Sequence, residues 1–245
     1  MSCCSHSPLA AALPDPSRCA SDTPLLPTDV TVAKVLQPTH VTGLIGKWGL
    51  GNIGTSGAPN AQGFTYFFGQ DTQVGCHNWY PWDGTAAGGR LYRQSTAVEV
   101  SANANATIET CGYRIQNCEW ANDMFGQEAK KFIAAHADKP FFLCTKAMLS
   151  LDLPDASLLA KLERVTITDL STTTPHEGNL GYTHGNPVPW DAGMGLFVDR
   201  DWPVVERNFS AAVWAQDLIV GSVLDALEEA HIQNDTVGER QITLS

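Results

Sequence analysis

The sequence predicts an α/β fold in which one sheet is covered by helices on both faces. Short apolar runs that suit buried strands, at residues 40–48 and 139–144, alternate with segments of helical periodicity. This alternation is typical of an α/β sheet covered on both faces. With 245 residues, of which 43% are hydrophobic and 17% charged, the chain is large enough for one globular domain of this kind.

The first half of the chain predicts few regular elements. Residues 1–28 are rich in Pro, Ser and Ala and predict an irregular segment, so that organised structure begins near Asp29. A short helix is expected over residues 31–36 and a buried strand over 40–48. The glycine-rich stretch 49–63 is expected to be a loop leading into the aromatic segment 64–69, and residues 70–118 are expected to be mostly irregular.

The second half predicts two helices and one strand. After Asp123, apolar residues recur at helical spacing and predict a helix; they are Phe125, Ala129, Phe132 and Ile133. The apolar run 139–144 then predicts a core strand. A second helix is expected over residues 205–230, with Pro203 at its start and with Glu228 and Glu229 on its polar side. Its apolar face is expected to comprise Phe209, Val213, Val220, Leu224 and Leu227.

Charge and composition exclude several classes of function. The formal net charge is −11 and the basic residues are scattered, so nucleic-acid binding is disfavoured. The same acidity repels anionic ligands at long range, and an anion site must therefore depend on a few local cations. No apolar stretch approaches the roughly 20 residues of a membrane-spanning helix, and no signal peptide is visible.

Seven cysteines and three glycosylation sequons leave the cellular compartment open. The cysteines form no paired C-x-x-C arrangement of the kind that holds structural zinc. The sequons begin at Asn105, Asn208 and Asn234 and would permit glycosylation in a secreted protein.

The glycine-rich loop matches a dinucleotide-binding fingerprint only superficially. Gly49, Gly51 and Gly54 have the G-x-G-x-x-G spacing after a predicted strand, but the chain continues through Gly57 and Pro59 instead of opening a helix. Motifs of serine hydrolases, zinc proteases and P-loop enzymes are missing from the sequence.

Several blocks, in order, resemble the sulfatase family. TGLIGKWGLG at 42–51 and PNAQGFTYFFG at 59–69 resemble the family's Gly-Lys-Trp-His-Leu-Gly block and the segment that follows it. Further blocks are NWYP at 78–81, KPFFL at 139–143, TPHEGN at 174–179, WPVVERNFSAAV at 202–213 and DLIVGSVLDALEEAHIQNDTV at 217–237.

This resemblance implies a mixed α/β sheet of the alkaline-phosphatase-like kind, present as an incomplete, truncated domain. The expected domain spans residues 29–237, with an atypical insertion at 145–169, and residues 238–245 form a divergent tail.

For site residues, the resemblance implies roles for Lys47 and His176. Lys47 would contact the sulfate group, and His176 would bind that group or protonate the leaving oxygen. Gly49 stands where the family usually has a second histidine.

The nucleophile and the metal site of the family have no clear counterpart. Sulfatases use a formylglycine made from Cys or Ser in C-x-P-x-R, and Cys4 lies in only a faint likeness of that motif. The family's Ca²⁺ is held by an Asp-Asp segment and a Ser-Asp-Asn-Gly segment, and neither occurs in this sequence, so no metal ligands are predicted.

The resemblance thus implies a sulfuric ester hydrolase of arylsulfatase type, acting on a small aryl sulfate or a sulfated carbohydrate. Two alternatives stay open: a catalytically inactive fragment that binds anions, and a phosphodiesterase or phosphatase of the same fold. Secreted, lysosomal or periplasmic location is expected from the resemblance alone.

Overall fold

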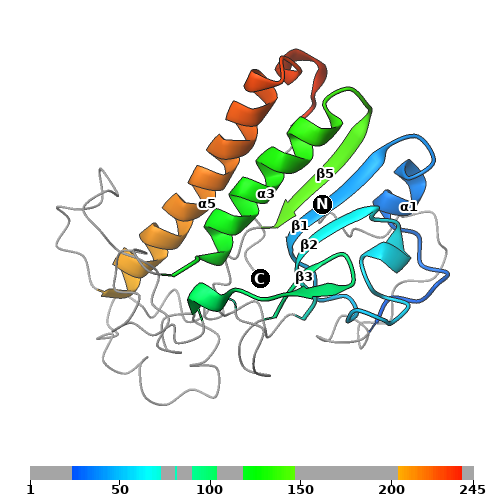
Figure 1. The fold of residues 1–245 in the computed structure, drawn as a ribbon, viewed down its shortest axis with the longest axis horizontal. Coiled ribbons are helices and arrows are strands. Elements are labelled where there is room, and N and C mark those ends of the chain that lie inside the picture. The colour runs from blue at the N-terminus through cyan, green and yellow to red at the C-terminus, as the bar shows by residue number, and fades with distance from the viewer. Residues whose placement is uncertain (1–23, 73–80, 82–89, 104–117, 147–203, 239–245) are drawn as a thin grey trace, which may run out of the picture.

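The computed structural model describes residues 24–72, 81, 90–103, 118–146 and 204–238 (Figure 1). In chain order, the elements are α1 (Val32–Leu36), β1 (Val41–Lys47), the 3₁₀ helix η2 (Asn60–Gln62), β2 (Tyr66–Gln70), β3 (Leu91–Arg93), β4 (Thr96–Val98), the 3₁₀ helix η4 (Ser101–Asn103), α3 (Ala121–His136), β5 (Phe141–Lys146), α5 (Val204–Glu229) and the 3₁₀ helix η9 (Gln233–Asp235).

The five strands form one mixed sheet in the order β4-β3-β2-β1-β5. β1 pairs in parallel with β2 and with β5, whereas β2–β3 and β3–β4 are antiparallel. The predicted mixed α/β sheet is therefore confirmed, and the strands expected at 40–48 and 139–144 are β1 and β5. The aromatic segment 64–69 contributes β2, which lies beside β1 in the sheet.

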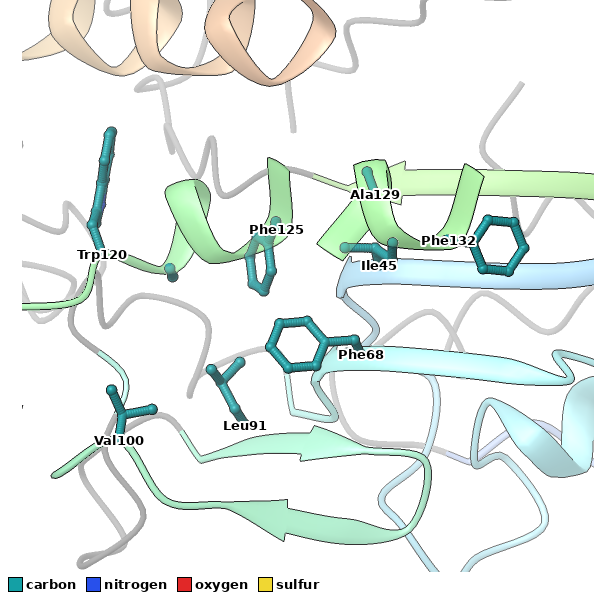
Figure 2. Packing of buried hydrophobic residues seen from close by; sticks show 9 residues of the cluster. Ile45, Phe68, Leu91, Val100, Trp120, Phe125, Ala129 and Phe132 are labelled. Atoms are coloured by element: carbon teal, nitrogen blue, oxygen red, sulfur yellow. The ribbon is translucent and has the colours of Figure 1, made fainter. Parts of the chain in front are cut away.

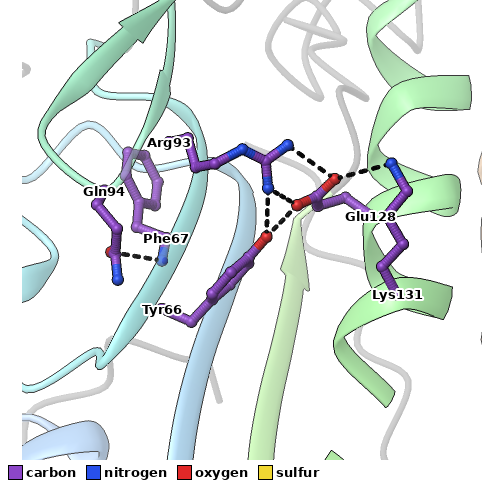
Figure 3. Close-up of polar contacts among 6 residues, drawn as sticks. All are labelled: Tyr66, Phe67, Arg93, Gln94, Glu128 and Lys131. Carbon is purple, nitrogen blue, oxygen red and sulfur yellow. Dashed lines mark hydrogen bonds and ion pairs between the residues drawn. The ribbon is translucent and has the colours of Figure 1, made fainter. Parts of the chain in front are cut away.

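The β3–β4 hairpin is a regular element that the sequence patterns did not predict within residues 70–118. Its two-residue turn is Gln94–Ser95, which lacks the Asn or Gly typical of such turns, although Gln94 has a φ of 56°. Contacts with β2 hold the turn: the Gln94 backbone N–H donates to the Phe67 carbonyl at 2.8 Å, and the Gln94 Oε1 accepts from the Phe67 N–H at 3.0 Å (Figure 3). Local sequence could not reveal a turn that tertiary contacts stabilise.

One face of the sheet packs against α3. Ile45 and Phe68 point from the sheet toward Phe125, Ala129 and Phe132 of α3 (Figure 2). The rings of Phe68 and Phe125 meet edge to face with centroids 6.2 Å apart. The helical spacing predicted for α3 is thus confirmed, and its apolar stripe covers this face.

α5 lies alongside α3, and the stripe it buries matches the expected one only in part: Leu227 is buried as expected, but Leu224 is not (Figure 1). Its buried side chains include Ile219, Ala226 and Leu227, whereas Leu224, assigned to the buried face, is 59% exposed. Apolar residues occupy several sides of this helix, so periodicity alone could not choose the side that meets α3. The side chains of residues 204–216, and Pro203, lie outside the described part.

The opposite face is covered by α1 and the glycine-rich loop. Leu44 and Phe67 pack there against Ala33 of α1 and against Trp48, in a second buried cluster. The two clusters alternate along β1 and β2, as expected for strands buried on both faces.

Two cysteines of the described residues, Cys118 and Cys144, are disulfide-bonded. Among the described helices, none is both long and apolar enough to span a membrane. Asn234, which begins one of the sequons, is exposed in η9.

Candidate anion-binding site

The carboxyl ends of the three parallel strands meet at one edge of the sheet, which we call the carboxyl edge. Lys47 ends β1, Gln70 ends β2 and Lys146 ends β5. A short turn joins α3 to β5, in which the Lys139 N–H donates to the His136 carbonyl at 3.0 Å, so α3 runs antiparallel to β5 and begins at the carboxyl edge (Figure 1). Open α/β sheets bind ligands at such edges.

Lys47 is held at this edge by a fixed backbone on both sides. It lies in register with Gln70 of β2 and is half-buried. The preceding Gly46 has a φ of 109°, and a Cβ there would lie 1.9 Å from the Lys146 carbonyl oxygen, so only glycine fits. The following Trp48 donates its backbone N–H to the Gln70 carbonyl at 2.9 Å and its Nε1–H to the Gly57 carbonyl at 2.8 Å. This geometry keeps Lys47 at the carboxyl edge.

Asp71 connects the end of β2 to the glycine-rich loop. Its Oδ2 accepts the Ile53 N–H at 3.0 Å, and its carbonyl accepts the Gly49 N–H at 3.1 Å. Asp71 is only 6% exposed. The carboxylate therefore fixes the loop beside Lys47, and the loop leads to the three-residue helix η2, not to the long helix that a dinucleotide site requires.

Sequence reasoning missed Asp71 and Lys146 as members of this edge. The sequence contained a signal for both residues: Asp71 directly follows the apolar strand β2, and Lys146 ends the apolar strand β5. Only the strand order brings them to the same edge as Lys47, since β1 and β5 are nearly one hundred residues apart in the chain but adjacent in the sheet.

His176 and Cys4 lie outside the described residues, as does the segment 147–203 that follows β5. In the described part of the chain, no three His, Cys, Asp or Glu side chains come together to hold a metal ion. The described residues therefore do not fit the calcium site that the resemblance implied, and no chemical step is assigned to a metal.

A second polar cluster, formed by Tyr66, Arg93 and Glu128, lies away from the carboxyl edge (Figure 3). The Arg93 guanidinium donates to both carboxylate oxygens of Glu128 and, at 2.7 Å, to the Tyr66 Oη, while the Tyr66 hydroxyl donates to Glu128. Tyr66 begins β2, so the cluster is about 13 Å along the strand from Gln70 at about 3.3 Å per residue.

Electrostatics in this cluster favour charged Arg93 and Glu128 and a neutral Tyr66. Burial and the carboxylate of Glu128 raise the pKa of the Tyr66 hydroxyl well above its ordinary value. Burial raises the pKa of Glu128, but the hydrogen bonds from Arg93 and Tyr66 outweigh it, and the net pKa is lowered. Because every member is bonded to another member and joins β2, β3 and α3, the cluster stabilises the fold.

No protein-family model and no curated protein matches the sequence. Among solved structures, Ps i-CgsB in complex with k-i-k-neocarrahexaose matches at a TM-score of 0.51 and 16% identity, over 88% of this chain and 40% of that chain. Ps i-CgsB without that ligand matches at a TM-score of 0.51 and 16% identity, over 86% of this chain and 39% of that chain. The PsFucS1 sulfatase from Pseudoalteromonas sp. matches at a TM-score of 0.42 and 18% identity, over 86% of this chain and 38% of that chain.

The five-stranded sheet with its helices corresponds to part of the Ps i-CgsB fold. The chain spans about 40% of the length of the Ps i-CgsB structures. At 16% identity the likeness is one of fold.

Proposed function

We propose that this chain is part of a sulfatase-type hydrolase domain whose carboxyl edge binds the sulfate group of a sulfate ester. The position of Lys47 carries this proposal. Its backbone is fixed by Gly46 and Trp48 at the end of the central parallel strand, where α/β sheets bind ligands. In a chain with a net charge of −11, a cation at this edge is the local attraction that an anionic ligand needs.

In the proposed hydrolysis, the sulfuryl group passes from the leaving oxygen to water. The Lys47 ammonium neutralises charge on the sulfate oxygens, and charge also develops on the leaving oxygen as its bond to sulfur breaks. His176 supplies the proton for that oxygen, because histidine titrates near neutral pH. The family's nucleophile motif is missing from the sequence, so these two residues account for binding and leaving-group protonation only.

Of the two substrate classes, sulfated carbohydrate is the better supported. The Ps i-CgsB structure holds the carbohydrate k-i-k-neocarrahexaose. The disulfides of Cys118 and Cys144 support a secreted, lysosomal or periplasmic location, since disulfides persist in oxidising compartments.

A second candidate function is anion binding without turnover. The missing C-x-P-x-R motif and the glycine at position 49 favour it, as does the lack of a metal-binding cluster among the described residues. Both candidates require that Lys47 bind sulfate, and they differ only in catalysis.

The test measures two properties of the purified chain: the affinity for inorganic sulfate by calorimetry, and the release of sulfate from a chromogenic aryl sulfate and from a sulfated oligosaccharide with calcium present. Lys47→Ala should weaken sulfate binding at least roughly tenfold, as for a lost charged hydrogen bond of about 1.5–3 kcal/mol. His176→Ala should reduce turnover more than sulfate affinity.

Lys139→Ala is the matched control, because Lys139 is exposed at the amino end of β5, away from the carboxyl edge. Sulfate binding without turnover would favour the binding function over hydrolysis. A folded chain that neither binds sulfate nor releases it would contradict both candidates.

A further inference from the structure

We infer that Asn234 is an N-glycosylation site of this chain, a modification that goes beyond the proposed function and does not depend on sulfate binding. Asn234, Asp235 and Thr236 form the sequon Asn-x-Thr, with a residue other than proline in the middle position. The sequon includes part of η9, the 3₁₀ helix that follows the end of α5. Of the other two sequons, Asn105 lies outside the described residues, and Asn208 belongs to the part of α5 whose side chains lie outside the described part.

The fold leaves the Asn234 side chain exposed and unengaged. Within the described ranges, no hydrogen bond or ion pair involves its amide. Two bonds that shape this turn use neighbouring groups instead: the Asp235 N–H donates to the Ile232 carbonyl at 3.0 Å, and the Thr236 Oγ1 donates to the same oxygen at 2.8 Å. A glycan on the Asn234 Nδ2 is therefore surface-exposed and replaces none of the bonds that shape the turn.

Asn234 lies at the opposite edge of the sheet from the candidate anion-binding site. Ile232, directly before η9, packs against the same buried cluster as Phe141, the first residue of β5. Val41 is the register partner of Phe141, and β1 runs from there to Lys47, ~20 Å away at about 3.3 Å per residue. A glycan on Asn234 therefore leaves the carboxyl edge open to a ligand.

The disulfides support the oxidising compartment that this modification requires. Cys118 and Cys144 are both disulfide-bonded, and disulfides persist in the ER lumen and in secreted proteins but are rare in the cytosol. In eukaryotic cells, glycans are attached to Asn-x-Ser/Thr sequons in the same ER lumen. The disulfides and the exposed sequon are independent observations that agree.

The proposed modification is a substitution at the anomeric carbon of a polyprenyl-pyrophosphate-linked oligosaccharide. The Asn234 Nδ2 forms a bond to that carbon, and the bond from the carbon to the pyrophosphate oxygen breaks. The lipid pyrophosphate leaves with the electron pair, and Nδ2 loses one proton. The Thr236 hydroxyl belongs to the recognised sequon, and in the folded chain it bonds to the Ile232 carbonyl. Transfer therefore precedes the formation of this hydrogen bond, and the exposure of Asn234 allows the glycosylated chain to fold.

The experiment expresses the full chain behind a secretion signal in a eukaryotic host and maps the modified asparagine. Cleavage after glutamate releases residues 230–239, in which Asn234 begins the single sequon. Peptide:N-glycosidase in heavy-oxygen water converts a glycosylated asparagine to labelled aspartate, which mass spectrometry detects. We expect this label in most of the parent chain. Thr236→Ser keeps the sequon and should retain the label, whereas Thr236→Val should abolish it, and Asn234→Gln should have one glycan fewer by intact mass.

The secreted chain and any chain retained in the cell are mapped in the same way, since transfer precedes secretion. An unlabelled Asn234 in the parent would overturn the inference and leave the proposed function standing. Label retained in Thr236→Val would also overturn it, because the modification would not depend on the sequon. Asn234→Gln should bind inorganic sulfate in calorimetry as the parent does, and a loss of affinity would contradict the placement of Asn234 away from the site. If the glycosylated parent fails to bind sulfate, only the proposed function fails.

Discussion

The face of the sheet under α3 and the face under α1 and the glycine-rich loop are both buried, but different interactions stabilise them. Under α3, the contact is made by large side chains such as Phe68, Phe125 and Phe132. On the other face, polar groups and backbone meet: the Gln62 Nε2 donates to the carbonyls of Leu26 at 3.1 Å and Ser56 at 2.7 Å. The first face depends mainly on packing, whereas the second combines its own hydrophobic cluster with buried hydrogen bonds and close backbone contact.

This difference explains where the candidate site lies. The rigid, hydrophobic α3 face sets the position of β1 and β5, while the loop on the other face is shaped by Asp71 and Trp48 around the end of β1. Active sites are often built in this way, with loops positioned by a rigid scaffold.

The largest loss of stability is expected from a substitution that disrupts the packing under α3. Phe125→Ala removes a side chain that is 1% exposed, so unfolding free energy should fall by about 3–5 kcal/mol in chemical denaturation. Leu224→Ala, on an exposed side of α5, should stay within about 0.5 kcal/mol. A similar loss in both variants would show that buried packing does not dominate this face.

The next prediction concerns backbone contact on the loop face. A Cβ at Gly57 would lie 2.2 Å from the Leu50 carbonyl oxygen and 2.6 Å from the Leu25 nitrogen, so Gly57→Ala should cost about 3 kcal/mol. At Gly54, which has a φ of 90°, nothing lies within 4 Å of the added Cβ, and Gly54→Ala should cost only about 1–2 kcal/mol. Equal losses in thermal melts would show that crowding at Gly57 is unimportant.

Glu128 is a polar exception on the α3 face, and its contribution should depend on pH. Since its pKa is lowered in the folded protein, it stabilises the fold above the unfolded-state pKa of about 4.3, and that stability is lost as pH falls through the lower folded-state value. Glu128→Gln should cost about 1.5–3 kcal/mol at pH 7. The difference from the parent should shrink in denaturation experiments toward pH 3, whereas a constant difference would contradict this assignment. Glu229→Gln, at an exposed position of α5, is the control.

The smallest effect is expected at the start of α1. Thr31 Oγ1 accepts the Lys34 N–H at 3.1 Å and donates to the Gln62 carbonyl at 2.6 Å, joining the helix to the loop. Thr31→Ala should cost about 1 kcal/mol, and Thr31→Ser, which keeps the hydroxyl, should recover most of it. Stability unchanged by Thr31→Ala would show that this bond is not needed.

Local patterns were sufficient for elements whose own residues stabilise them. The spacing of Phe125, Ala129 and Phe132 predicted α3, because a helix buries side chains three and four residues apart. The β3–β4 hairpin was missed, since its Gln94–Ser95 turn is stabilised by bonds to β2. The buried stripe of α5 was placed wrongly at Leu224, because the neighbouring helix selects which apolar side is covered.

The sequence by itself determined the α-helices, the strands at 40–48 and 139–144 and the place of Lys47 at the end of a strand, because these follow from the pattern of adjacent residues. Only the tertiary structure decided that β5 lies beside β1 and that Gly46 is aligned with Lys146. Pairing between strands far apart in the chain depends on how all the elements pack together, and no short segment of sequence contains that information.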